Sequence, residues 1–204
     1  MTGNYISSYD VKMLAQISYE DLGFNTDGDY ETWLDEDLIP RVEGIIEKYC
    51  DVPSGFFVAG GVAVSNELRD YREEGILLKY SPVVKITKVE INTAGCGSTE
   101  TWSATTKYVE NLDLGTIRIV SVSPGCDDQG VRVTYTAGFV ALPSAVEYAC
   151  IQLAANVLHA TLQRKISPTV RVGDFTIKLV VPSCFTKEIK ELLKPFTRMK
   201  VSVG

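Results

Sequence analysis

The sequence predicts an α+β fold: a helical bundle of about four helices, an inserted small antiparallel β-sheet and a C-terminal β-hairpin. Apolar residues recur at helical spacing in residues 8–50, alternate in much of residues 56–137, and return to helical spacing in residues 143–200. Because 204 residues suffice for one sizeable core, we expect a single domain spanning residues 1–204, with the β region inserted between its helical parts.

The first helical part is expected to begin with a short helix over residues 9–17, capped by Ser7 or Ser8. Residues 23–30 are polar and rich in turn formers, which predicts a loop. A longer amphipathic helix follows, and Pro40 predicts a kink or break within it because proline lacks an N–H. Its buried stripe is expected to consist of Trp33, Leu34, Leu38, Val42, Ile45, Ile46 and Tyr49.

The middle of the chain has the composition of short strands separated by turns. Residues 83–91 do not keep one alternation, so we expect a bulge or twist near Thr87 and Lys88. The expected strands lie at residues 76–80, 83–91, around 102, and at 107–109, 116–120 and 131–136.

The last third of the chain returns to helices. Pro143 and Ser144 open the longest predicted helix, which ends near Arg164. A β-hairpin over residues 170–179 is expected to turn at Gly173 and Asp174, and a final basic helix covers residues 185–196.

Composition indicates a globular protein with ordinary hydrophobic and charged fractions of 45% and 23%. The N-terminus lacks the features of a signal peptide, and the longest apolar stretch, residues 56–64, is too short to span a bilayer. We therefore expect a protein made in the cytoplasm, with no membrane partner. Cys50 and Cys150 are predicted to be buried free thiols. Cys96 and Cys126 lie in glycine-containing loops that could approach each other, but pairing is the less favoured interpretation.

Charge is distributed unevenly along the chain, whose formal net charge is −6. Residues 1–50 carry a net −8, residues 51–150 a net −4 and residues 151–204 a net +6. One interpretation is solvated faces and helix-dipole matching. The other is that oppositely charged ends meet, in neighbouring subunits or in stacked partners.

The sequence offers no set of residues suited to catalysis, a cofactor or a metal. Its one histidine, His159, lies within a predicted helix, where packing or a helix–helix hydrogen bond is expected rather than a catalytic role. Residues 94–98 contain two glycines but lack the lysine of a phosphate loop. The C-terminal lysines have no recognition motif around them, so protein contact is favoured over nucleic-acid binding. This absence favours a structural, non-enzymatic assembly protein.

Several stretches together resemble the head–tail connector (adaptor) family of tailed phages. They are Leu38-Ile39-Pro40-Arg41-Val42, Leu77 to Ile86, Val131 to Phe139 followed by Pro143 and a long helix, Val172 to Thr176, and Leu192 to Phe196. The resemblance covers roughly residues 30–200, and the segment before residue 30 has no counterpart in it. Gly138, in the turn that follows the strand of residues 131–136, is expected to adopt positive φ.

The resemblance implies a virion protein of the head–tail neck, a ring of identical subunits, expected to number twelve, that is docked to the portal protein. A stopper or tail-completion protein would join it below, and genomic DNA would pass through its channel without sequence-specific binding. Residues expected to contact the portal are Phe185, Lys187, Lys190, Lys194, Phe196, Arg198 and Lys200. Acidic residues expected to face the channel, where negative charge repels DNA, are Asp27, Asp29, Glu31, Asp35, Glu36 and Asp37.

Two alternatives remain open at this point. Another neck or tail component, such as a stopper or tail terminator, would share the assembly role, although such proteins are more often mainly β. An unrelated ligand-binding module would require a concave apolar pocket.

Overall fold

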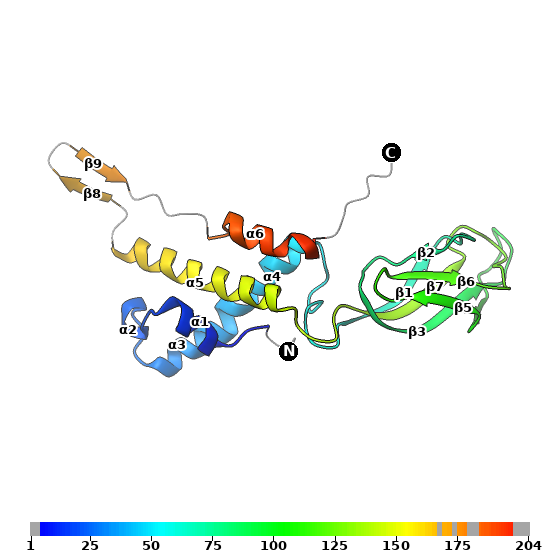
Figure 1. The fold of residues 1–204 in the computed structure, drawn as a ribbon, viewed down its shortest axis with the longest axis horizontal. Coiled ribbons are helices and arrows are strands. Elements are labelled where there is room, and N and C mark those ends of the chain that lie inside the picture. The colour runs from blue at the N-terminus through cyan, green and yellow to red at the C-terminus, as the bar shows by residue number, and fades with distance from the viewer. Residues whose placement is uncertain (1–4, 167–168, 173–174, 179–183, 198–204) are drawn as a thin grey trace. The chain divides into compact units, whose positions relative to one another are not determined.

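The computed structural model describes residues 5–166, 169–172, 175–178 and 184–197, and the chain divides into two compact units. The helical unit is formed by Met1–Val52 together with Pro143–Gly204, and the β unit by Pro53–Leu142 (Figure 1). Helices therefore come from both ends of the chain, and antiparallel strands come from its middle. The predicted α+β class, with a sheet region inserted between helical parts, is confirmed.

Three short helices open the helical unit: α1 (Ser8–Ala15), α2 (Tyr19–Leu22) and α3 (Asp27–Trp33). Ser7 caps α1, as predicted, by accepting a hydrogen bond from the backbone N–H of Asp10. The expected loop over residues 23–30 is only partly correct, because α3 begins within it. Thr26 caps α3 through the N–H of Asp29, and the acidic residues of the first turn suit the positive end of a helix dipole.

The next helix runs through Pro40 without interruption of its buried stripe. A π-helical turn, η1 (Leu34–Leu38), leads directly into α4 (Ile39–Cys50), and Pro40, which lacks an N–H, lies in the first turn of α4, next to the junction of the two segments. Leu34, Leu38, Val42 and Ile46 are buried at steps of four. Ile45 and Tyr49 were predicted to belong to this stripe, and that prediction is wrong, because both are exposed.

The long helix α5 (Ser144–Ile166) is the central element of the helical unit. Helices α1, α2, α4 and α6 (Lys187–Leu193) all pack on it. Its buried residues include Val146, Ala149, Cys150 and Leu153. A 3₁₀ turn, η2 (Lys194–Phe196), follows α6 and contains Pro195. Strands β8 (Thr169–Val172) and β9 (Phe175–Lys178) form the predicted hairpin, whose expected turn residues lie outside the described part of the chain.

The β unit contains two antiparallel sheets rather than one. The larger has the strand order β1-β7-β3-β4 and the smaller the order β2-β6-β5. The strands are β1 (Val62–Arg69), β2 (Ile76–Leu77), β3 (Val83–Asn92), β4 (Trp102–Ala104), β5 (Tyr108–Asn111), β6 (Thr116–Ile119) and β7 (Val131–Ala137). The alternation of β7 is complete, with every second side chain from Val131 to Ala137 buried. The pairing of β3 with β7 shifts register between Ile86 and Lys88, which confirms the predicted bulge.

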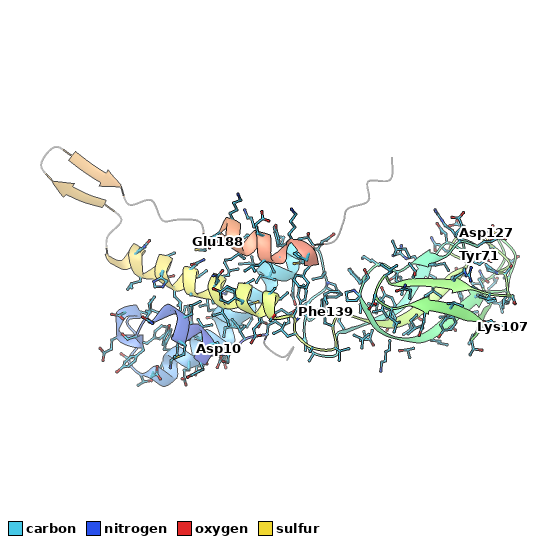
Figure 2. All side chains as sticks on the ribbon, viewed as in Figure 1. Asp10, Tyr71, Lys107, Asp127, Phe139 and Glu188 are labelled. Carbon is cyan, nitrogen blue, oxygen red and sulfur yellow. A yellow bond between two sulfur atoms is a disulfide. The ribbon has the colours of Figure 1, made fainter. Side chains whose placement is uncertain are left out.

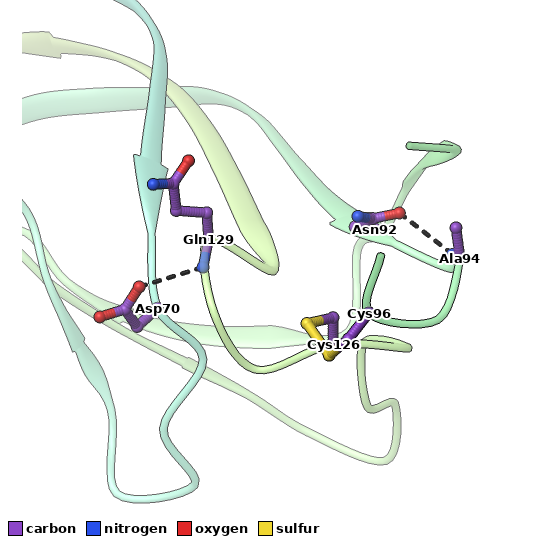
Figure 3. The surroundings of a disulfide bond; sticks show 6 residues. All are labelled: Asp70, Asn92, Ala94, Cys96, Cys126 and Gln129. Atoms are coloured by element: carbon purple, nitrogen blue, oxygen red, sulfur yellow. Dashed lines mark hydrogen bonds between the residues drawn. A yellow bond between two sulfur atoms is a disulfide. The ribbon is translucent and has the colours of Figure 1, made fainter. Parts of the chain in front are cut away.

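One end of the β unit is closed by a disulfide between Cys96 and Cys126 (Figure 3). The bond joins the loop that follows β3 to the loop that precedes β7. Hydrogen bonds secure the same loops, from the N–H of Gln129 to Asp70 Oδ1 at 3.0 Å and from the N–H of Ala94 to Asn92 Oδ1 at 3.0 Å. The pairing that the sequence analysis disfavoured is therefore present. Cys50 and Cys150 are buried free thiols, as predicted.

Candidate interaction surfaces

A row of exposed lysines follows one face of α6. Lys187, Lys190 and Lys194 are all exposed, while Ile189 and Leu193 of the same helix are buried. Thr186 fixes the start of α6 by accepting a hydrogen bond from the N–H of Ile189. The helix therefore anchors its apolar face in the unit and presents its lysines to solvent, as the sequence predicted for a contact surface.

Two exposed glutamates border the lysine row of α6. Glu188 and Glu191 are exposed and lie three residues apart. Successive helix positions are separated by about 100°, so Glu188 lies about 100° from Lys187, whereas Glu191 lies one turn after Lys187 and about one turn before Lys194. The lysines of α6 thus share one side of the helix, and Glu191 borders that side. Arg198 and Lys200, which the sequence analysis assigned to the same surface, lie outside the described residues.

Phe185, just before α6, lies against the end of α4. Its ring meets the ring of Tyr49 edge-on, with centroids 4.9 Å apart, and Lys190 Nζ lies 5.7 Å from the Phe185 centroid. Ile45, one turn before Tyr49, is 46% exposed. The lysine row of α6 therefore borders an apolar patch that the sequence analysis had assigned partly to the core.

The acidic residues expected to face a channel are mostly exposed, but most of them have partners within the helical unit. Lys12 Nζ lies 2.8 Å from both Asp27 and Glu31, and these hydrogen bonds raise the pKa of Lys12. Asp29 accepts the hydroxyl of Thr26 at 2.8 Å, Asp35 that of Ser8 at 3.3 Å, and Asp37 pairs with Arg41 at 2.9 Å. Glu36 is exposed. The segment is thus less negative than its composition suggests, although it keeps an excess of acids.

Buried carboxylates secure the N-terminal segment, a feature that the sequence analysis did not predict. The backbone N–H of Tyr5 and the hydroxyl of Tyr5 donate to Glu43 and Glu47 of α4, respectively. Burial raises the pKa of Glu43 to about 7, and the N–H groups of Tyr5 and Ile6 oppose that shift. The helical period of α4 was the only feature of the sequence that could have indicated this burial, because it places Glu43 and Glu47 next to the buried Val42 and Ile46.

His159 is exposed on α5, so the expectation that it packs in a helix–helix contact is wrong. Within the part of the chain that the structure describes, three or more His, Cys, Asp or Glu side chains do not gather as metal ligands would. Among the helices described, none combines the length and apolar character required to cross a bilayer.

The fold is shared with proteins from the neck of a phage-like particle. A chain in the neck of an empty GTA particle, computed with C6 symmetry, is 15% identical with a TM-score of 0.52, and the match covers 96% of this chain and 91% of that one. A chain in the neck of a native GTA particle, computed with C12 symmetry, is 16% identical with a TM-score of 0.52, over 87% and 90%. GTA denotes gene transfer agent.

Neither a protein-family model nor a curated protein matches this chain. At 15–16% identity, the likeness to the two neck chains defines the fold class and nothing finer. The class is an α+β protein with the fold of neck subunits, and the match extends over nearly the whole length of each chain.

Proposed function

We propose that this chain is a structural virion protein of the head–tail neck, and that it forms a ring of identical subunits beneath the portal. The supporting observation is the shared fold, which spans about nine-tenths of each neck chain, one of them in an assembly with C12 symmetry. A twelve-fold ring requires no active site. Its mechanism is geometric: it offers one symmetric surface to the head and another to the tail.

The test of this proposal uses tailless, DNA-filled heads that lack the protein. Purified chain is added, and the portal vertex is imaged. We expect a ring of added density beneath the portal, and tails should then attach. If no density appears and tails attach equally well without the protein, the connector role is wrong. A monomer that retains a small molecule through purification would then favour a ligand-binding module.

We further propose that the lysine row of α6 and the segment after it dock on the portal. Lys187 and Lys194 lie two turns apart on one exposed strip, which suits an acidic surface on a partner. Phe196, Arg198 and Lys200 follow directly in the sequence. Deletion of residues 186–204 would be a poor test, because it also removes Ile189 and Leu193 from the core of the unit.

A charge reversal tests portal docking without this complication. The double variant Lys187→Glu/Lys194→Glu should bind tailless heads roughly tenfold more weakly, because two favourable contacts become repulsive. The matched control is Lys85→Glu/Lys107→Glu, which reverses the same number of charges at exposed lysines of the β unit and should bind normally. Equal binding by both variants would contradict docking through this row.

We also propose that the acidic segment of α3 and η1 faces the channel, where its remaining negative charge keeps passing DNA from adhering. Glu36 is the best probe, because it is exposed and its removal disturbs no cap or ion pair described above. Its position can be read from an image of the assembled ring. A location on the outer wall of the ring would rule the channel role out.

A further inference from the structure

Helix α1 presents an apolar face to solvent. Tyr9 is 66% exposed and Met13 60%, and they lie one turn apart on the side of α1 opposite the buried Val11 and Ala15. Leu14 is exposed beside them. We call Tyr9, Met13 and Leu14 the α1 face.

Acidic side chains border the α1 face. Asp10 lies on α1 itself, between Met13 and Leu14 around the helix axis. On the other flank of the face, Lys12 forms ion pairs with Asp27 and Glu31, and the hydroxyl of Ser8 donates a hydrogen bond to Asp35. Three carboxylates therefore lie close to α1. Four acids and one lysine surround the face, and its surroundings are therefore negative.

A second apolar face lies where α4 ends and α6 begins. Tyr49 is 37% exposed, Ile45 lies one turn earlier, and the Phe185 ring stacks edge-on against Tyr49. We call Ile45, Tyr49 and Phe185 the α4 face. It is bordered by lysines: Lys190 approaches the Phe185 ring, and Lys48 is exposed beside Tyr49 on α4. Among the acids near this face in sequence, Glu43 and Glu47 are buried, whereas Asp51, which ends α4, and Glu188 are exposed.

The two faces belong to one compact unit and lie on different sides of it. Helices α1 and α6 both pack on α5. Figure 1 shows them on opposite sides of α5, and Figure 2 marks the two sides by Asp10 of α1 and Glu188 of α6. A single copy therefore cannot cover its own α1 face with its own α4 face. Two separate copies can do so.

Charge decides which faces can meet. Two α1 faces brought together would oppose carboxylates to carboxylates, and two α4 faces would oppose lysines to lysines, which is unfavourable at short range. An α1 face against an α4 face brings apolar side chains together inside a rim of opposite charges. A ring with rotational symmetry also requires two different complementary surfaces on each subunit, because its contacts are head to tail.

From this geometry we infer that the α1 face of one copy docks on the α4 face of the next, and that this contact closes the ring. The inference rests on the proposed function, since it names the surface that joins the subunits of the ring. It assigns Phe185 to the contact between copies and places Lys190 at the border between that contact and the lysine row that docks on the portal. The partner is thus a second copy of this chain.

Thiol cross-linking tests the contact. The background variant Cys184→Ser removes the free thiol that is not fully buried, and burial raises the pKa of Cys50 to about 11, which keeps that thiol unreactive. In this background we compare Met13→Cys, Ile45→Cys and the double variant. Each is added to tailless heads, treated with a short bismaleimide and separated under denaturing conditions.

A head-to-tail contact gives a distinctive pattern. The double variant should form a covalent ladder that extends beyond dimers, while each single variant should stay monomeric, because its thiols do not face each other. Dimers from a single variant would show that like faces meet, and they would overturn the inference. The same holds if a ring is visible on the heads but the double variant forms no ladder.

The test also separates this inference from the proposed function. If imaging shows a ring and cross-linking fails, the proposed function as a ring subunit is retained, and only the assignment of the contact surfaces is wrong. If no ring forms on heads with the wild-type chain, the connector role itself fails, and the contact falls with it. A matched control places cysteine at Gln16, which is exposed on the chain just past α1, and Gln16→Cys/Ile45→Cys should give a weaker ladder.

Discussion

Tyr5 and Glu43 are 38 residues apart in the sequence, yet the backbone N–H of Tyr5 donates to the carboxylate of Glu43 in the interior of the helical unit. Glu43 is only 8% exposed, and its neighbour Glu47 accepts the hydroxyl of the same tyrosine. The start of the chain is therefore held on α4 by two buried carboxylates. Such an arrangement makes the helical unit sensitive to pH.

The stability of the helical unit should fall as the pH rises from 4.5 to 7. Burial raises the pKa of Glu43 from its ordinary value of 4.5 to about 7, so the folded chain holds a proton that the unfolded chain releases. The stabilising contribution is complete below pH 4.5 and is lost as the pH passes through 7. The neutral variant Glu43→Gln should thus be more stable than wild type at pH 8 by about 1–3 kcal/mol.

Urea unfolding, followed by the helical circular dichroism signal at pH 5 and pH 8, measures this difference. Glu36→Gln is the control, because Glu36 is exposed and should behave as wild type at both values. The explanation fails if Glu43→Gln and wild type lose the same stability between pH 5 and pH 8.

Reduction should destabilise the β unit. The disulfide joins Cys96 to Cys126 across 30 residues, and a loop of that length contributes about 2–4 kcal/mol by restricting the unfolded chain. The wild-type β unit should therefore unfold at a lower urea concentration in the presence of a reductant. The fluorescence of Trp102, which lies in the β unit, follows this transition. The variant Cys96→Ala/Cys126→Ala should match reduced wild type and should not respond to the reductant. A response in this variant would point to another thiol.

Much of the fold could be predicted because apolar residues recur every three to four positions in its helices and every second position in its strands. Buried residues at steps of four identify η1 and α4, and the complete alternation of β7 identifies the centre of the larger sheet. Strand β1 was missed because its burial pattern is broken by a bulge, at which Asn66 adopts φ of 55°. Helix α3 was missed because its seven residues include three acids and a glycine, a composition typical of a loop. The helix is stabilised by the Thr26 cap and by the ion pair of Asp27 with Lys12, and neither can be read from a local pattern.

The sequence predicted the charged surface of α6, but it did not predict the exposed apolar residues beside it. Helical spacing placed Lys187, Lys190 and Lys194 on one face, and the structure agrees. The same spacing assigned Ile45 and Tyr49 to the core, because a period shows which residues share a face and not how wide the covered part of that face is. The Cys96–Cys126 pairing depends on two loops that converge only after β3 and β7 have paired. No local pattern carries that information.

Gly138 should tolerate no side chain. Its φ is 124°, as the sequence predicted for positive φ, and a Cβ there would lie 2.3 Å from the carbonyl oxygen of Phe56. Gly138→Ala should therefore destabilise the β unit by about 2–4 kcal/mol. Gly60 provides a matched control: its φ is also positive, at 88°, but a Cβ would meet nothing within 4 Å.

The Gly60→Ala variant should lose only about 1 kcal/mol, the cost of the backbone conformation alone. Thermal unfolding of both variants, compared with wild type, checks the difference. Equal losses for the two would show that backbone strain, rather than the close approach of Phe56, makes glycine necessary at position 138.

Tyr135 of the inner strand β7 and Glu67 of the edge strand β1 join these neighbouring strands to the segment that follows β2. The hydroxyl of Tyr135 donates to Glu67 Oε2 at 2.6 Å and accepts the N–H of Tyr80 at 3.2 Å, while Glu67 Oε1 accepts the N–H of Lys79 at 2.7 Å. Burial and the nearby carboxylate raise the pKa of Tyr135, so the hydroxyl remains a donor at alkaline pH.

Tyr135→Phe should destabilise the β unit by about 1–3 kcal/mol, because a buried carboxylate loses a donor and a backbone N–H loses its acceptor. Tyr108→Phe, on the edge strand β5, should change stability by less than about 0.5 kcal/mol. Combining Tyr135→Phe with Glu67→Ala should cost less than the sum of the single changes, because each single change already removes the hydrogen bond between these two side chains. Urea unfolding of the four chains measures the coupling, and strict additivity would mean that the bond contributes nothing to the stability of the sheet.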